Sequence, residues 1–260
     1  MKYIFTIVIL FATTFCCGYE VDPVFFDVEP IRSENRYSET LNEIEARMPS
    51  SHIYRDSDKT THSHECSHGL CSRLRIQNGQ KYGTNETLYV LEGKSVLIIH
   101  PRIKISDVAT RIPSGMRGTR YKLYLLDQQR YWNNEPIYLC EEWICYVNGG
   151  IVGYEYGLKD RTADSIDASL EFFGYCLYMM KIVKELDPKY DDRQLRAFIM
   201  WHGRRVSHIA RRLYEEKILW SRSCKWYERI NTSAETASLR QFCLQYFGKE
   251  WCKEAIGFTK

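Results

Sequence analysis

The second half of the chain has apolar residues at intervals of three and four, a spacing that predicts amphipathic helices. The clearest case is the segment 162–186, whose periodic apolar residues are Ile166, Leu170, Phe173, Leu177, Met180 and Val183. These residues fall on one helix face, which we expect to pack against the core. We also predict one or two helices within 192–220 and one within 232–247, the latter opened by the capping-box spacing of Thr232 and Glu235.

The first half combines strand patterns with short helix patterns. Residues 87–100 predict two strands, because Val, Leu, Ile and Tyr fill both sides of Glu92-Gly93-Lys94 and a central glycine suits a hairpin loop. We predict a further strand at 121–126 and helices at 38–48 and 103–112. Together these patterns predict an α+β fold that is mostly helical, with a small β-hairpin sheet.

Another helix is predicted for residues 62–77, which contain no proline and only one glycine. Asp58, Thr60 and Thr61 are N-cap candidates before it, and Asn78-Gly79 supplies a stop after it. We expect the β-hairpin to lie beside this helix.

This helix carries His64-Glu65-Cys66-Ser67-His68, which has the pattern H-E-x-x-H. Positions i and i+4 lie on the same helix face, so His64 and His68 can point two imidazoles at one metal ion. Glu65 lies beside the first histidine, where it can take a proton from a metal-bound water. His62 diverges from His64 on a helix, so the two are a weak ligand pair. The competing interpretation is a surface helix with two unrelated histidines.

A second informative stretch runs from Pro136 to Gly150 and reads as a short helix with two adjacent carboxylates among apolar residues. Charged side chains are costly to bury unless they are paired or bind a metal. A zinc site with two histidines needs a third protein ligand, and Glu142 is our first choice. Glu141 would then orient a histidine from behind, although it remains the alternative ligand. The alternative interpretation is that both acids lie at a helix N-terminus, where negative charge interacts favourably with the helix dipole, and bind no metal.

Hydrolysis at such a site needs a hydrogen-bond donor for the oxyanion of the tetrahedral intermediate. Tyr146 is the candidate that we select. Alternative donors are Tyr121, Tyr154, Tyr156 and His202.

The motif at 64–68, followed by a glutamate on a later helix, resembles the gluzincin class of zinc metallopeptidases. The resemblance implies that His64, His68 and Glu142 bind zinc and that Glu65 is the general base. It covers these two helices only. The N-E-x-x-x-D sequence of thermolysin-like members and the longer metzincin motif are both absent, so no subfamily is assigned.

The N-terminus has the features of a secretory signal peptide. Lys2 is followed by an apolar run of thirteen residues, and Gly18 offers a small residue for cleavage. The alternative is an uncleaved membrane anchor, although the run is short for a span. We expect 1–18 to be removed, 19–59 to be a flexible arm or a pro-segment, and 60–260 to form one catalytic-type domain. That domain would consist of a metal-site half, 60–157, and a helical half, 158–260.

The cysteine count agrees with export. Eight of the ten cysteines follow the signal segment, and an even number in a secreted chain predicts up to four disulfides. We hypothesise that a bond such as Cys66–Cys140 or Cys71–Cys145 joins the two metal-site helices. Asn85 and Asn231 begin glycosylation sequons.

Composition limits the range of functions. A net charge of +3 does not favour a nucleic-acid partner, and no later stretch is apolar enough to span a membrane. The sequence therefore predicts a secreted zinc-dependent peptidase acting on a protein or peptide. The alternative is a non-catalytic secreted binding or effector protein with a structural or non-catalytic metal site.

Overall fold

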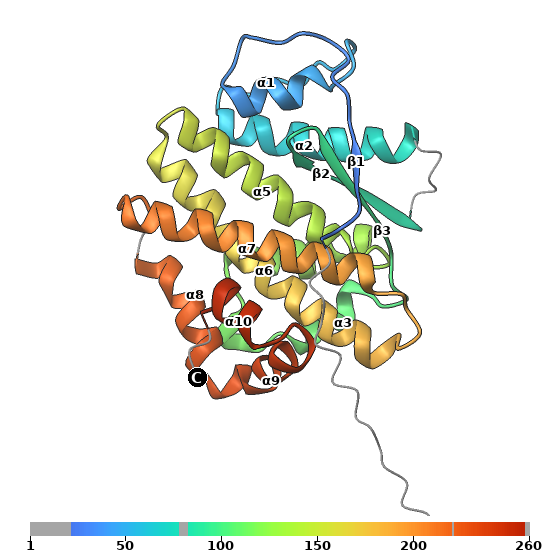
Figure 1. Cartoon of the computed structure of the whole chain (residues 1–260), viewed down its shortest axis with the longest axis vertical. Coiled ribbons are helices and arrows are strands. Elements are labelled where there is room, and N and C mark those ends of the chain that lie inside the picture. Colours follow the sequence, from blue (N-terminus) through green and yellow to red (C-terminus); the bar gives the residue numbers. More distant parts are fainter. Residues whose placement is uncertain (1–21, 78–82, 220, 258–260) are drawn as a thin grey trace, which may run out of the picture.

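Two long antiparallel helices, α5 (Tyr138–Glu155) and α6 (Lys159–Leu186), form the centre of the molecule (Figure 1). The structure is a computed structural model that describes residues 22–77, 83–219 and 221–257, without the side chains of 221–224. Helix α2 (Lys59–Gln77) packs across α5, on the side where the small sheet lies. The signal-peptide prediction falls on residues outside the described ranges.

The other helices surround this centre. Those before α5 are α1 (Glu39–Ala46), α3 (Ile105–Arg111), a 3-10 turn η1 (Ser114–Met116), a π-helical turn η2 (Tyr121–Asp127) and α4 (Gln129–Trp132). Those after α6 are α7 (Arg193–Glu215), α8 (Ser221–Thr232), η3 (Ala234–Thr236), α9 (Ala237–Tyr246) and α10 (Lys249–Ala255). All six periodic residues predicted for the core face of α6 are buried.

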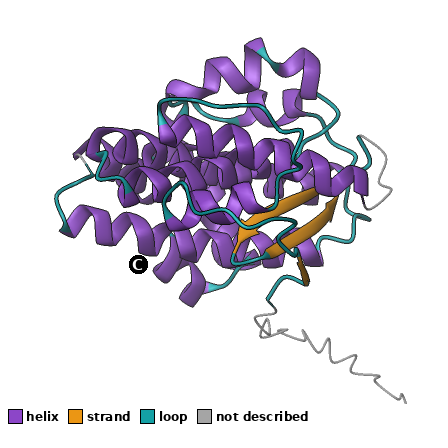
Figure 2. Cartoon of the chain, turned by 90° about the horizontal axis from the view of Figure 1, so that it is seen from above, coloured by secondary structure: helices purple, strands orange, loops and turns teal. Residues whose placement is uncertain are grey.

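The sheet has three antiparallel strands in the order β1-β3-β2, and it lies to one side of the helices (Figure 2). Strands β2 (Asn85–Leu91) and β3 (Lys94–Ile99) form the predicted hairpin, whose turn uses positive φ angles at Leu91, Glu92 and Gly93. The third strand, β1 (Phe25–Asp27), comes from the segment before α1. The coarse prediction of a mostly helical α+β fold with a small sheet is thus confirmed.

Two local predictions are wrong. Residues 121–126 are not a strand but the π-helical turn η2, because their buried residues Tyr121, Tyr124 and Leu125 are spaced as on a helix. The helix expected to end near Asn148-Gly149-Gly150 continues to Glu155. Its glycines act as contact points with neighbouring helices: a Cβ on Gly150 would lie 2.6 Å from Ile166 Cδ1 of α6.

The N-terminal segment 22–58 packs onto the back of α2. It contributes Val28, Ile44 and Met48 to a small core that also contains residues of α2 and β2, namely Cys66, Leu70, Cys71, Leu74, Tyr89 and Leu91. Without the segment these apolar side chains would be exposed to water. The packing favours a permanent part of the fold, and whether the segment is removed as a pro-segment stays a prediction.

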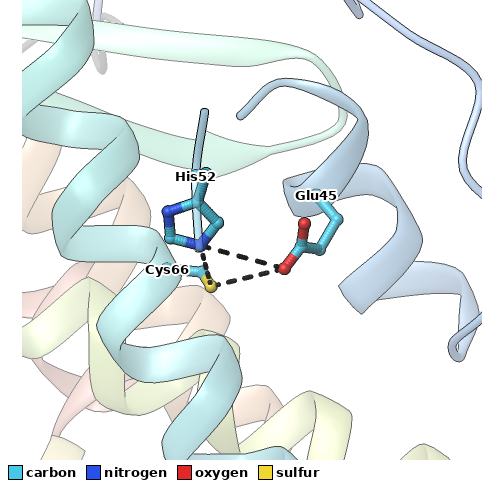
Figure 3. A group of neighbouring side chains, drawn as sticks. All are labelled: Glu45, His52 and Cys66. Carbon is cyan, nitrogen blue, oxygen red and sulfur yellow. Dashed lines mark hydrogen bonds and ion pairs between the residues drawn. The ribbon is translucent and has the colours of Figure 1, made fainter. Parts of the chain in front are cut away.

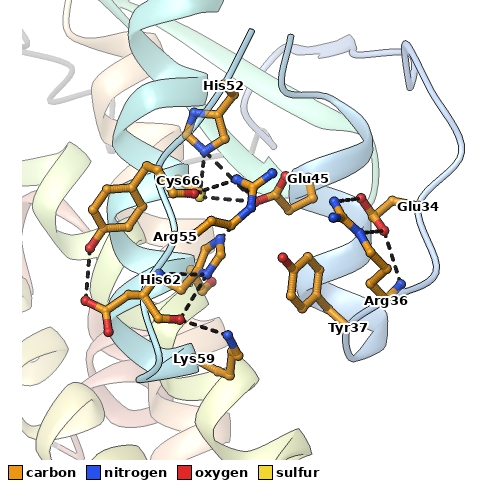
Figure 4. Close-up of polar contacts among 12 residues, drawn as sticks. Glu34, Arg36, Tyr37, Glu45, His52, Arg55, Lys59, His62 and Cys66 are labelled. Carbon is orange, nitrogen blue, oxygen red and sulfur yellow. Dashed lines mark hydrogen bonds and ion pairs between the residues drawn. The ribbon is translucent and has the colours of Figure 1, made fainter. Parts of the chain in front are cut away.

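A fully buried carboxylate, Glu45 of α1, lies at the centre of this contact. It approaches Cys66 of α2 and His52 of the following loop (Figure 3), and His52 Nε2 lies 3.2 Å from Cys66 Sγ. Arg32 Nη2 donates to its Oε2 at 2.7 Å. His62 Nε2 lies 2.8 Å from its Oε1, and Figure 4 shows His62 and Arg55 near Glu45. Burial raises the pKa of Glu45, but the hydrogen bond with His62 and the charge of Arg55 outweigh it and lower that pKa below its usual value.

The seven cysteines whose side chains the structure describes are free: Cys66, Cys71, Cys140, Cys145, Cys176, Cys243 and Cys252. The predicted disulfides, including Cys66–Cys140 and Cys71–Cys145, are therefore unconfirmed. No helix in the described ranges is long and apolar enough to span a membrane. Glycosylation also stays a prediction, although Asn231 Nδ2 already donates to two backbone carbonyls in the folded chain.

We predict that Glu45→Gln lowers the free energy of unfolding by about 3 kcal/mol, because it leaves Arg32 and His62 against a neutral side chain. Urea unfolding of the purified protein measures this effect. The matched control is Glu39→Gln in the exposed first turn of the same helix, where a change below about 0.5 kcal/mol is expected. If Glu45→Gln lowered the free energy of unfolding as little as the control does, the buried network would contribute no stability.

Candidate metal centre

The predicted helix at 62–77 is confirmed as α2, and one of its faces lies against α5. His64 and His68 project from α2 toward Glu142 of α5. The two Nε2 atoms are 3.2 Å apart. Glu142 Oε2 lies 3.5 Å from His64 Nε2, and Oε1 lies 3.4 Å from His68 Nε2. The structure thus brings all three sequence-predicted ligands together.

These separations match those of zinc ligands. In a tetrahedral site with bonds of about 2.0–2.1 Å, neighbouring ligand atoms lie about 3.3–3.4 Å apart. The donors, two imidazole nitrogens and a carboxylate oxygen, are also a donor set that zinc accepts. In addition, Glu142 Oε2 is buried and accepts no hydrogen bond within the described part of the chain. A buried carboxylate oxygen without a donor is costly, and a cation between it and the histidines would remove that cost.

A second layer of contacts orients each ligand. Glu141 Oε1 lies 2.6 Å from His68 Nδ1, which leaves Nε2 of that ring facing His64 and Glu142. The His64 ring hydrogen-bonds the backbone of Cys145. Tyr138 donates its hydroxyl proton to Glu142 Oε1. Such partners fix ring orientation and tautomer in metal sites. Of the two acids weighed from the sequence, Glu142 faces the Nε2 atoms of both histidines, and Glu141 contacts His68 at Nδ1.

The protonation of the two histidines reflects the same geometry. Burial and the neighbouring His68 lower the pKa of His64 to about 4, so this ring is neutral and free to ligate. Burial also lowers the pKa of His68, but the surrounding Cys145, Glu142 and Glu141 outweigh it and raise that pKa well above its usual value. His68 thus holds a proton among acidic neighbours, and a bound cation would replace that proton.

The three residues open into a cleft of about 530 Å³. Glu65 lies at its exposed wall beside His64, which is where the sequence places the general base. The other cleft residues are mainly aromatic or small and polar: Gly69, Ser72, Arg75, Tyr124, Gln128, Trp132 and Tyr138. The cleft therefore offers apolar surface and hydrogen bonds next to the candidate metal position.

Tyr146, the predicted oxyanion donor, packs its ring against His64 at a centroid distance of 4.5 Å but lines a neighbouring cavity rather than the cleft. Its hydroxyl lies 2.8 Å from the hydroxyl of Tyr124, which does line the cleft. Sequence reasoning missed Tyr124 because it treated 121–126 as a strand. The helical spacing of Tyr121, Tyr124 and Leu125 is the signal that could have identified it.

The other candidate donors lie elsewhere. Tyr121 donates to the Ala109 carbonyl, and Tyr156 accepts from the Ser38 backbone. Tyr154 contacts Glu216 and Arg212 at the surface. His202 is fully buried against Trp143. None of them lines the cleft.

The described residues contain other clusters of potential ligands, but arginines neutralise two of them. Arg32 and Arg55 contact Glu45 in the cluster with His52 and Cys66. In the cluster of Glu86, His100 and Glu135, Arg75 donates twice to Glu86. A third cluster, with Glu141 and Cys145, shares His68 with the candidate centre. No arginine or lysine within ion-pair distance of Glu142 is described, so charge favours the centre at His64, His68 and Glu142.

Comparison of this chain with protein-family models, with curated proteins and with solved structures finds no match.

The close approach of α2 and α5 can be tested at Gly149, where a Cβ would lie 3.0 Å from the Thr60 carbonyl oxygen and 3.7 Å from His64 Cβ. We predict that Gly149→Val destabilises the protein by about 1–3 kcal/mol in urea unfolding, because the added methyls push the helices apart. Gly149→Ala is the graded control. The alanine Cβ adds one close contact with the Thr60 carbonyl oxygen, but alanine also has a helix propensity about 1 kcal/mol better than glycine, so this variant should be nearly neutral. A neutral valine would contradict the tight helix contact.

Proposed function

We propose that this protein is a secreted zinc-dependent peptidase, with His64, His68 and Glu142 as zinc ligands. The observation that carries the proposal is the convergence of two imidazole nitrogens and a buried carboxylate at 3.2–3.5 Å, the spacing of tetrahedral zinc ligands. Three protein ligands would leave one position for water or substrate, as in catalytic rather than structural zinc sites. The secreted location rests on the sequence features of residues 1–18.

Bound zinc supplies Lewis acidity, which brings the pKa of a bound water toward neutrality. The remaining roles belong to the chain. Glu65, at the exposed wall of the cleft, accepts a proton from the attacking water and returns it to the leaving amine. Glu141 holds His68 in the tautomer that presents Nε2, and Tyr138 fixes the orientation of the Glu142 carboxylate.

The cleft also contains a donor suited to an oxyanion. The bond between the Tyr124 and Tyr146 hydroxyls can run in either direction. When Tyr146 is the donor, the Tyr124 proton is free to point into the cleft. Arg120 lies 5.7 Å from the centre of the Tyr146 ring, and its positive charge opposes the rise that burial causes in the Tyr146 pKa, which favours Tyr146 as the donor. We therefore assign the donor role to Tyr124 and a positioning role to Tyr146.

A peptide is the substrate class that suits this cleft best. Trp132, Tyr138 and Tyr124 provide flat apolar surface, while Ser72 and Gln128 provide hydrogen-bonding groups for a peptide backbone.

The first test combines zinc content with peptide hydrolysis. We expect one zinc per chain after loading and dialysis, and loss of that zinc in His64→Ala. Glu65→Gln should keep the zinc and lower hydrolysis of a peptide library by at least about 10²-fold, because the general base is lost. Glu39→Gln serves as the matched control, because Glu39 is exposed on α1 and does not line the cleft.

The outcomes separate the two candidate functions. Zinc bound at one per chain with no hydrolysis of any peptide would favour a non-catalytic binding protein with a metal site. Failure of the folded wild-type chain to bind zinc would refute the proposal altogether.

The donor assignment has its own test. Tyr124→Phe should lower kcat by about 10²-fold with little change in KM, because the lost hydrogen bond forms mainly in the transition state. Tyr146→Phe should have a smaller effect, since it only orients Tyr124. The reverse order would return the donor role to Tyr146.

A further inference from the structure

Two buried thiols lie close together between α5 and α6, and one of them is next in sequence to the acidic pair Glu141 and Glu142 of α5. Cys140 of α5 and Cys176 of α6 have their sulfur atoms 3.7 Å apart, and both side chains are fully buried. Cys140 immediately precedes Glu141 and Glu142 in the sequence. The two residues lie on helices that pack along much of their length, so their separation is set by the helix pair and not by a loose loop.

We propose that Cys140 and Cys176 form a disulfide bond in the exported protein and thereby join α5 to α6. In a disulfide the sulfurs lie about 2.0 Å apart with a dihedral near ±90°, and from 3.7 Å side-chain rotation about χ1 is the movement that would bring them together. The inference rests on the export part of the proposed function, because persistent disulfides belong to oxidising compartments. It does not depend on zinc or on catalysis.

The other cysteines near the metal centre have different neighbours. Cys66 contacts His52 and Glu45, and Cys71 accepts a hydrogen bond from the Tyr89 backbone. Cys145 lies beside His68 and Glu141. The sequence-based hypothesis paired Cys140 with Cys66, whereas the structure gives Cys140 a sulfur contact with Cys176.

The chemistry balances with a small-molecule disulfide such as oxidised glutathione. The thiolate of one cysteine attacks it and releases one glutathione, which leaves a mixed disulfide. The second cysteine then attacks this mixed disulfide, forms the Cys140–Cys176 bond and releases the second glutathione. The two protons leave with the released thiols, and two electrons pass to the oxidant.

The timing of this reaction follows from burial. Oxidised glutathione cannot reach two fully buried sulfurs, and burial together with the neighbouring Cys140 raises the pKa of the Cys176 thiol well above its usual value. The reactive thiolate is therefore scarce in the folded state. The bond should form during folding and not by adding oxidant to the folded, reduced protein.

The consequence concerns the metal centre. Glu141 and Glu142 lie on the turn of α5 that Cys140 begins, and α2 contacts that turn through His64 and His68. A bond to α6 would hold the same turn from another side. The third ligand would then be fixed by a covalent link as well as by packing.

The test is disulfide mapping of the full chain, unfolded and reduced, then refolded in a glutathione redox buffer. Free thiols are alkylated in denaturant, and the digest is analysed by mass spectrometry without reduction. We expect a cross-linked peptide pair containing Cys140 and Cys176, with Cys66, Cys71 and Cys145 alkylated. Folded protein kept reduced until it is mixed with oxidised glutathione should show both residues alkylated.

Matched variants add a stability readout. Cys140→Ser, Cys176→Ser and the double variant each lose the same bond, so under oxidising conditions the double variant should lower Tm by less than the sum of the two single variants. Full alkylation of Cys140 and Cys176 in refolded wild-type protein, or cross-links from either residue to another cysteine, would overturn the proposal. Mapping of the wild-type chain decides the question even if a variant fails to fold, and it needs neither zinc nor peptidase activity.

Discussion

The structure depends on one close approach, that of α2 and α5. It places a carboxylate that is 2% exposed opposite two imidazoles that are 13% and 19% exposed. Burying a carboxylate costs several kcal/mol unless a partner compensates its charge. Here the compensation comes from histidines that are themselves aligned by Glu141 and by the Cys145 backbone. Each ring nitrogen thus has a neighbour, whereas Glu142 Oε2 is buried and accepts no hydrogen bond within the described part of the chain, which favours a cation site.

The elements around this contact keep the two helices in position. Gly149 and Gly153 let α5 approach the start of α2 closely: a Cβ on Gly153 would lie 2.9 Å from Thr60 Oγ1. Behind α2, the buried Glu45 and its arginine and histidine partners fasten the N-terminal segment to the same helix. Behind α2, arginines thus neutralise the carboxylate of Glu45. On the opposite side of α2, the carboxylate of Glu142 has no described arginine or lysine at ion-pair distance. That difference in charge distinguishes a structural polar cluster from a candidate metal centre.

The sequence predicted the motif helix and the hairpin, and it selected three side chains that the structure brings together, because each prediction depends on local spacing. The i and i+4 histidines require only a helix, and a carboxylate within an apolar helix suggests by itself that it has a partner. The sequence could not show that segment 22–58 builds part of the core, since its polar composition conceals the few residues, such as Ile44, that are buried. It also missed Tyr124, because a short apolar run is ambiguous between strand and helix until its neighbours are known. The glycines of α5 predict the end of a helix from sequence. Only their packing against α2 and α6 explains why the helix continues through them.

The identity of the atoms around the ion tests this account most directly. X-ray absorption spectroscopy at the zinc edge of the loaded protein should show a shell of nitrogen and oxygen at about 2.0–2.1 Å with imidazole scattering and no sulfur. That result would match His64, His68 and Glu142. A sulfur shell at about 2.3 Å would contradict the account, because it would place the ion at one of the cysteine-containing clusters instead.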